Sequence, residues 1–138
     1  MTDAEIEAIV REARTVAVLG MKDARDAAAP AYQIPRVLRE HGIEVIAVNP
    51  EIDGFLPDVS ALTQRVDILD VFRRAENVDA HVDEILAMPA ELRPPVVWLQ
   101  TGIINPRAAA RLEAAGIHVV MDECLGVWAA RLRPRSQG

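Results

Sequence analysis

The chain has 138 residues and a single cysteine, Cys124, which fits one domain and excludes an internal disulfide. A net charge of -6 and only 4% aromatic residues argue against nucleic acid as a partner, because phosphate backbones need basic patches and single strands need stacking rings. No apolar run approaches the ~20 residues of a membrane span, and the acidic start is unlike a signal peptide, so we expect a cytoplasmic protein without membrane contact.

The start of the chain predicts a helix followed by a buried strand. Thr2 and Glu5 have the spacing of a capping box, in which the hydroxyl and the carboxylate each accept a backbone amide hydrogen. An apolar stripe then extends to Ala13, as expected for one face of a helix. The run 15–19 is short, rich in β-branched residues and followed by Gly20, which is typical of a strand covered on both faces of a parallel sheet.

A proline sets the expected start of the second helix. Apolar residues recur at helical spacing, and Gly42 follows them as a helix end. Pro35 has no amide hydrogen and therefore fits only a first turn. The helix is accordingly expected to start near Ala31, with 21–30 as a loop.

The rest of the chain continues the alternation of strands and helices, apart from an irregular stretch at 51–65. Proline and glycine residues mark where the helices begin and end. The remaining strands are expected at 45–48, 67–72, 96–99 and 117–121. Three further helices are expected. The first ends before Pro89, the second runs from Asn105-Pro106 to Gly116, and the third ends before Pro134.

This alternation predicts an α/β fold with a Rossmann-like, doubly wound parallel sheet of five strands, ordered 3-2-1-4-5, with helices on both faces. Residues 1–138 are expected to form one such domain. Ligands of these sheets bind beyond the carboxyl ends of the strands, where the strand order reverses. The expected site therefore lies between the first and the fourth strands.

Two segments at this edge carry residues suited to phosphate. Gly20 lets a phosphate approach the backbone, and Lys22 and Arg25 follow it as cations. A solvated charged loop is the alternative. The run Phe72-Arg73-Arg74 suits a base or a pantetheine chain beside a phosphate, unless the aromatic is core and the arginines are surface.

The residues that follow the second and fourth strands narrow the choice of ligand. NAD-binding domains usually carry Asp or Glu after the second strand, whereas this chain has Asn49-Pro50, which tolerates a phosphorylated ribose or forms a plain turn. After the fourth strand, Gln100 and Gly102 lie nearer the crevice than Trp98, which is expected in the core. The histidines are dispersed, and neither a nucleophile elbow nor metal-ligand spacing occurs. Cys124 is either a thiolate favoured by a helix start or a buried core thiol.

These segments together resemble a known family, the small bacterial CoA-binding proteins related to the CoA-binding domain of the succinyl-CoA synthetase α subunit. The resemblance extends from about Thr15 to Leu125. It is carried by the segments Val18-Leu19-Gly20, Val48-Asn49-Pro50, 67–73 (Asp-Ile-Leu-Asp-Val-Phe-Arg), 97–103 (Val-Trp-Leu-Gln-Thr-Gly-Ile) and 119–124 (Val-Val-Met-Asp-Glu-Cys).

The resemblance implies a CoA-binding fold without the second domain that carries ligase chemistry. It implies that the Gly20 loop and Asn49-Pro50 hold the ADP end of CoA, and that 71–73 and 99–102 line the pantetheine arm. No catalytic or metal-ligating residue is expected. The expected cofactor-binding residues are Gly20, Met21, Lys22, Arg25, Asn49, Pro50, Val71, Phe72, Arg73, Leu99, Gln100, Thr101, Gly102 and Cys124.

The sequence thus favours a stand-alone protein that binds coenzyme A or an acyl-CoA, without evident catalytic machinery, as a carrier, a sensor or a partner subunit. An NAD(P)- or FAD-binding redox enzyme or sensor is the alternative, which the missing acidic residue after the second strand disfavours. An interaction protein that has lost its ligand is a third hypothesis. We expect no nucleic acid or membrane partner and leave open a homodimer or a further protein partner.

Overall fold

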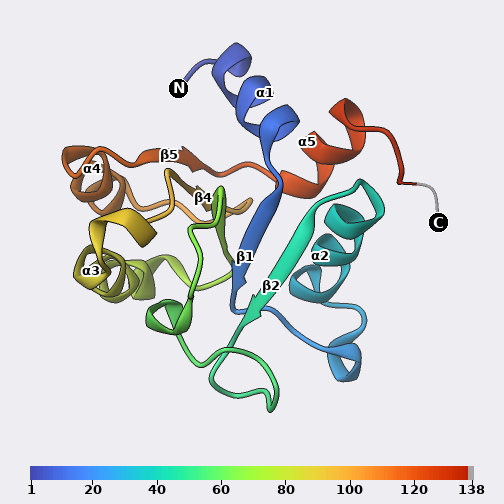
Figure 1. Ribbon diagram of the computed structural model, residues 1–138, viewed down its shortest axis with the longest axis horizontal. Helices are drawn as coiled ribbons and strands as arrows, with labels where there is room; N and C mark the ends of the chain where they lie inside the picture. Colours follow the sequence, from blue (N-terminus) through green and yellow to red (C-terminus); the bar gives the residue numbers. More distant parts are fainter. Residues whose placement is uncertain (137–138) are drawn as a thin grey trace.

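The computed structural model describes residues 1–136 and contains a sheet of five parallel strands between two layers of helices (Figure 1). The strands are β1 (Thr15–Leu19), β2 (Glu44–Val48), β3 (Ile68–Val71), β4 (Val96–Leu99) and β5 (His118–Met121). The helices are α1 (Asp3–Glu12), α2 (Pro30–Glu40), α3 (Val78–Ala87), α4 (Pro106–Ala114) and α5 (Leu125–Leu132). The α/β class, the five strands and the parallel sheet are therefore confirmed.

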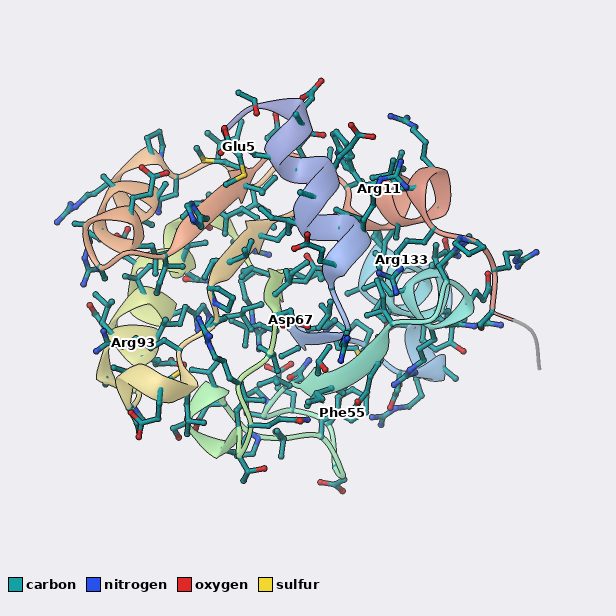
Figure 2. All side chains as sticks on the ribbon, turned by 45° about the horizontal axis from the view of Figure 1, so that its top comes forward. Glu5, Arg11, Phe55, Asp67, Arg93 and Arg133 are labelled. Atoms are coloured by element: carbon teal, nitrogen blue, oxygen red, sulfur yellow. The ribbon has the colours of Figure 1, made fainter. Side chains whose placement is uncertain are left out.

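The order of the strands is β2-β1-β3-β4-β5, so the predicted order 3-2-1-4-5 is wrong in the place of the third strand. The connection from β2 passes across β1, and β3 pairs with β1 on its other side. Asp67 fixes this position, because its carboxylate accepts hydrogens from the backbone amides of Arg14 and Thr15 at 2.8 and 3.1 Å (Figure 2). The burial of the strands agrees with this order, since β3 is buried throughout whereas β2 is partly exposed at the edge of the sheet.

Each face of the sheet has its own apolar core. Helices α1, α2 and α5 cover one face, and α3 and α4 cover the other (Figure 1). Trp98 is fully buried in the first core, and its indole N–H donates to the backbone oxygen of Glu123 at 2.8 Å. The expectation that Trp98 belongs to the core is confirmed. No helix within residues 1–136 has the length and apolar character needed to cross a membrane.

The capping box of α1 forms as predicted, but α2 begins earlier than expected. Pro30 is its first residue, so Pro35 lies in the second turn rather than the first. An interior proline ordinarily destabilises a helix, partly because it leaves the carbonyl four residues earlier without a partner. Here that carbonyl belongs to Ala31, and it accepts a hydrogen from the backbone amide of Lys22 at 3.1 Å. The loop after β1 thus satisfies the group that Pro35 cannot.

Candidate functional site

The carboxyl ends of β1, β3 and β4 open into a cavity of about 690 Å³, which the start of α2 and the residue before α5 complete. With β3 beside β1, the strand order reverses between these two strands, and such a switch point is where open α/β sheets bind ligands. The volume lies within the usual range for small-molecule sites. The cavity is lined by Gly20, Lys22, Ala29, Pro30, Ala31, Ile34, Phe72, Arg73, Arg74, Gln100, Thr101, Ile103 and Cys124.

Gly20 is the point where the loop after β1 meets the end of β3. Its φ is 84°, and a Cβ placed on it would lie 2.3 Å from the backbone oxygen of Phe72. Only glycine fits both the left-handed backbone and this close approach. The Gly20 amide donates to the oxygen of Val48 at 2.8 Å, which ties the loop to β2 as well. The backbone is therefore held at the rim of the cavity.

Three cations and the start of α5 give the cavity a positive character. Lys22, Arg73 and Arg74 line it, and the Arg73 Nε is buried with no hydrogen-bond partner among residues 1–136. Cys124, the residue that precedes α5, makes no side-chain cap, whereas α2 begins with Pro30, which has no amide hydrogen to offer. Exposed amides at a helix start favour an anion, and guanidinium groups bind phosphate in a fixed geometry. The arrangement suits a phosphorylated ligand.

The same cavity has an apolar wall. This wall is formed by Ile34 of α2, by Phe72 at the end of β3 and by Ile103 in the loop after β4. The first turn of α5 supports this wall, because the position of a Cβ on Gly126 would lie 3.1 Å from Ile34 side-chain carbons. An extended aliphatic or pantetheine-like chain can be buried against such a surface.

Gln100 at the floor of the cavity is bonded to a buried carboxylate behind it. Gln100 is 4% exposed, and its Nε2 donates to the two carboxylate oxygens of Asp70 at 2.8 and 3.0 Å. Asp70 lies within β3 and is fully buried. Burial raises the pKa of Asp70 to about 8, although the hydrogen bond from Gln100 opposes this shift. Sequence reasoning missed Asp70, for which the one signal is an acidic residue within an otherwise apolar strand.

The predicted site residues divide into two groups. One group lines the cavity and consists of Gly20, Lys22, Phe72, Arg73, Gln100, Thr101 and Cys124. The other group lies near the same edge of the sheet but does not line the cavity, and consists of Met21, Arg25, Asn49, Pro50, Val71, Leu99 and Gly102. The cavity is also lined by residues that were not predicted to belong to the site, namely Ala29, Pro30, Ala31, Ile34 and Ile103. Those at the start of α2 were missed because α2 was expected to begin later.

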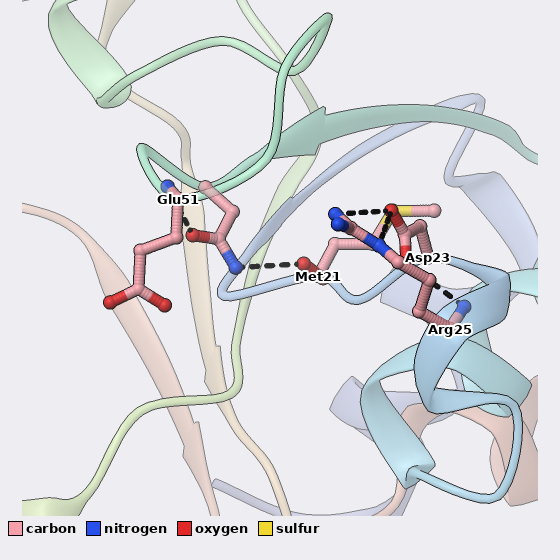
Figure 3. Close-up of polar contacts among 5 residues, drawn as sticks. Met21, Asp23, Arg25 and Glu51 are labelled. Carbon is pink, nitrogen blue, oxygen red and sulfur yellow. Dashed lines mark hydrogen bonds and ion pairs between the residues drawn. The ribbon is translucent and has the colours of Figure 1, made fainter.

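Asn49 holds the backbone rather than facing the cavity. It is fully buried, its Nδ2 donates to the Met21 oxygen at 2.9 Å, and its Oδ1 accepts from the Glu51 amide at 2.9 Å (Figure 3). Both polar atoms of the side chain are thereby engaged. Asn49 connects the loop after β1 with the turn after β2, so it shapes the Gly20 loop from behind.

Arg25 and Gly102 also make contacts within the chain. Arg25 pairs with Asp23 at 3.0 Å at the surface, and its side-chain hydrogen bonds are the main reason that the pKa of Asp23 is lowered (Figure 3). The Gly102 amide donates to the Asp122 Oδ1 at 2.7 Å, which joins the loop after β4 to the end of β5. Val71 and Leu99 are buried in the core beneath α3 and α4.

The chain is similar to known proteins over most of its length. The family model described as CoA binding domain matches residues 14–130. The uncharacterized protein YneT of Bacillus subtilis (strain 168) is 35% identical over 129 residues, covering 90% of this chain and 91% of YneT. A protein of solved structure from Thermus thermophilus is 42% identical with a TM-score of 0.86, covering 96% of this chain and 99% of that one. A hypothetical protein from Pyrococcus horikoshii OT3, 24% identical, shares the fold with a TM-score of 0.80 over 96% of this chain and 92% of that one.

The match of the family model covers most of the chain, including all five strands and the whole lining of the cavity. The chain therefore belongs to the CoA binding domain family.

Proposed function

We propose that the protein binds coenzyme A or an acyl-CoA in the cavity at the β1–β3 switch point and acts as a carrier, a sensor or a partner subunit. One observation carries the proposal, namely that a single cavity combines cations and the uncapped start of α5 with an apolar wall. CoA needs both, because its nucleotide is phosphorylated and its pantetheine arm is long and largely uncharged.

The expected contacts with CoA are inferred from the residues that line the cavity. The phosphates are assigned to Lys22, Arg73 and the backbone at Gly20, and the pantetheine arm to the wall formed by Ile34 and Phe72. The residues that do not line the cavity, such as Asn49, are assigned a supporting role through the loops they hold. Among the described residues no histidine lines the cavity, so Cys124 has no imidazole base beside it there. This supports a binding role rather than catalysis.

Thermal unfolding with added ligands tests the proposal. A ligand at ~100 times its dissociation constant adds roughly 2.7 kcal/mol of stability, which raises the Tm of a domain of this size by several degrees. We expect CoA to raise the Tm, and NAD at equal concentration to leave it unchanged. Equal stabilisation by NAD or FAD would favour the redox alternative, and native mass spectrometry of the purified protein would identify a cofactor that co-purifies.

A further inference from the structure

A carboxylic acid, Asp70, lies behind the cavity floor, and within residues 1–136 its side chain bonds to one neutral amide, that of Gln100. Asp70 stands between Val18 of β1 and Trp98 of β4 in the register of the sheet, so both of its neighbouring strands are apolar there. Its side chain contacts Gln100, which lines the cavity. Nothing assigned to the CoA site above uses this acid.

The helices that cover the Asp70 face of the sheet bury no charged residue. The buried residues of α1, α2 and α5, which pack on this face of the sheet, are all apolar or glycine, and the charged residues of these helices are exposed or half-buried. The ionisable groups at the cavity are Lys22, Arg73, Arg74 and Cys124, and none of them forms an ion pair or hydrogen bond with Asp70. Gln100 is therefore the group that responds when Asp70 gains or loses its proton.

The two protonation states of Asp70 require different orientations of the Gln100 amide. An ionised carboxylate only accepts hydrogen bonds, so Gln100 directs its NH₂ group at Asp70. Oε1 then lies on the far side of the amide from the carboxylate and is available to a ligand in the cavity that Gln100 lines. A protonated carboxyl has an O–H that needs an acceptor, and Oε1 of Gln100 is the acceptor at hand. Protonation of Asp70 thus withdraws the amide oxygen from the cavity and leaves an N–H there.

We propose that Asp70 decides which end of the Gln100 amide faces the bound ligand, and thereby sets whether the cavity floor recognises a hydrogen-bond donor or an acceptor. The inference rests on the proposed function and deepens it. The pantetheine arm of CoA carries amide N–H donors, which the oxygen of Gln100 accepts when Asp70 is ionised. Binding of CoA therefore selects the ionised state, and the proton of Asp70 passes to the solvent buffer.

The orientation of Gln100 can be followed without any ligand. Cysteine thiols ordinarily ionise in the alkaline range, so the protein carries Cys124→Ser as a background. We expect the side-chain NH₂ signals of Gln100 in ¹⁵N-resolved NMR spectra to shift between pH 7 and 9.5, and this shift to vanish in Asp70→Asn, because an asparagine permanently presents the donor and acceptor of a neutral acid. Asp83→Asn on α3, on the opposite face, makes the same chemical change and should titrate like the parent.

Calorimetry with S-methyl-CoA, whose thiol is blocked, then tests recognition of the ligand. With the pKa of Asp70 near 8, a ligand that binds only the ionised state gains about tenfold in affinity from pH 7 to pH 9. Titrations in buffers of different ionisation enthalpy should show proton release of up to about one proton below pH 8. Both effects should be absent in Asp70→Asn and present in Asp83→Asn.

The outcomes separate this inference from the proposed function. Gln100 signals that stay fixed from pH 7 to 9.5 overturn the role of Asp70, whatever CoA does. Signals that move in the parent but equally in Asp70→Asn overturn it as well. If the Gln100 signals shift with pH in the parent but not in Asp70→Asn, and S-methyl-CoA binds at no pH, the proposed function is refuted while the control of Gln100 by Asp70 is supported. If the ligand binds with no pH dependence and no proton release, the recognition of a donor by Gln100 is wrong.

Discussion

At the level of single residues, the buried Nε of Arg73 is the clearest sign that the cavity is suited to an anion. A buried donor without a partner costs free energy, and native structures seldom leave one unsatisfied. Arg73 also lies against the Gly20 loop, where its Nε is 3.3 Å from the position of a Cβ on that glycine. A phosphate at this point would satisfy the guanidinium and reach the loop backbone together.

Substitution of Arg73 by alanine should accordingly weaken CoA binding. The loss of a hydrogen bond to a charged group costs about 1.5–3 kcal/mol, which is roughly a tenfold to hundredfold loss of affinity. Arg25→Ala is the matched control, because Arg25 is an exposed arginine that pairs with Asp23 outside the cavity. Calorimetry on both variants measures the difference. Equal losses in the two variants would contradict the placement of the phosphate at Arg73.

Residue identities alone reveal part of this site and conceal the rest. Gly20, Lys22 and Arg73 could be predicted, because a glycine at a strand end and cations after neighbouring strands have a direct meaning for phosphate binding. Asn49 could be located but not interpreted, since its hydrogen bonds to Met21 and Glu51 depend on loops whose paths the sequence does not reveal. Asp70 was not predicted as part of the site, because it lies in β3 whereas its partner Gln100 follows β4, so their pairing is not visible in the sequence.

Among the secondary-structure elements, the ends of three helices are joined by one side chain. Arg133, just after α5, donates from Nη1 to the oxygens of Val10, Arg11 and Ala13 at 2.8–3.0 Å, where α1 ends. Its Nε donates to the oxygen of His41 at 3.0 Å, where α2 ends (Figure 2). A cation at the negative end of a helix is favourable, and the fork of the guanidinium reaches both helices together.

Arg133→Ala should therefore destabilise the whole layer of α1, α2 and α5. We expect a loss of about 2–3 kcal/mol in the free energy of unfolding, since four carbonyls, three of them in part-buried hydrogen bonds, lose their charged donor. Arg135→Ala removes an exposed pair with Glu40 and should cost less than about 1 kcal/mol. Urea denaturation of the two variants provides the comparison. If Arg135→Ala cost as much as Arg133→Ala, the arginine fork would not be what joins the helices.

The elements themselves were largely predictable, whereas their neighbours in space were not. Runs such as 15–19 and 96–99 identify buried strands from composition alone, and the expected strands correspond to the five observed ones. The place of β3 depends on Asp67 bonding to the amides of residues 14 and 15, a contact between distant parts of the chain. Apart from Glu44, β2 is as apolar as the inner strands, so its half-exposed position at the edge could not be predicted from residue types.

For the molecule as a whole, Asp70 makes stability depend on pH. Its pKa is about 8 in the folded protein and near the ordinary value of 3.8 when unfolded. Between these values the folded protein holds a proton that the unfolded chain has released, so the free energy of unfolding falls as pH rises, by up to about 1.4 kcal/mol per unit for one proton. The contribution is complete below about pH 4 and is lost as pH rises through 8.

Asp70→Asn should remove this slope. We expect its stability to exceed that of the wild type increasingly from pH 5.5 to pH 9, measured by urea denaturation at each pH. Asp83→Asn, an exposed carboxylate paired with Arg111, should keep the slope of the wild type. Parallel curves for the wild type and Asp70→Asn over this range would contradict the raised pKa of Asp70.

The cavity draws its lining from residues as far apart as Gly20 and Cys124, and the first turn of α5 supports Ile34 of α2. This has a consequence for the order of events on the ribosome. A nascent chain can pair β1 with β2 and then add β3 in turn, but Ile34 lacks its support from Gly126 and the cavity lacks Cys124 until α5 has left the exit tunnel. We therefore expect a growing chain to bind its ligand tightly only once α5 has been made.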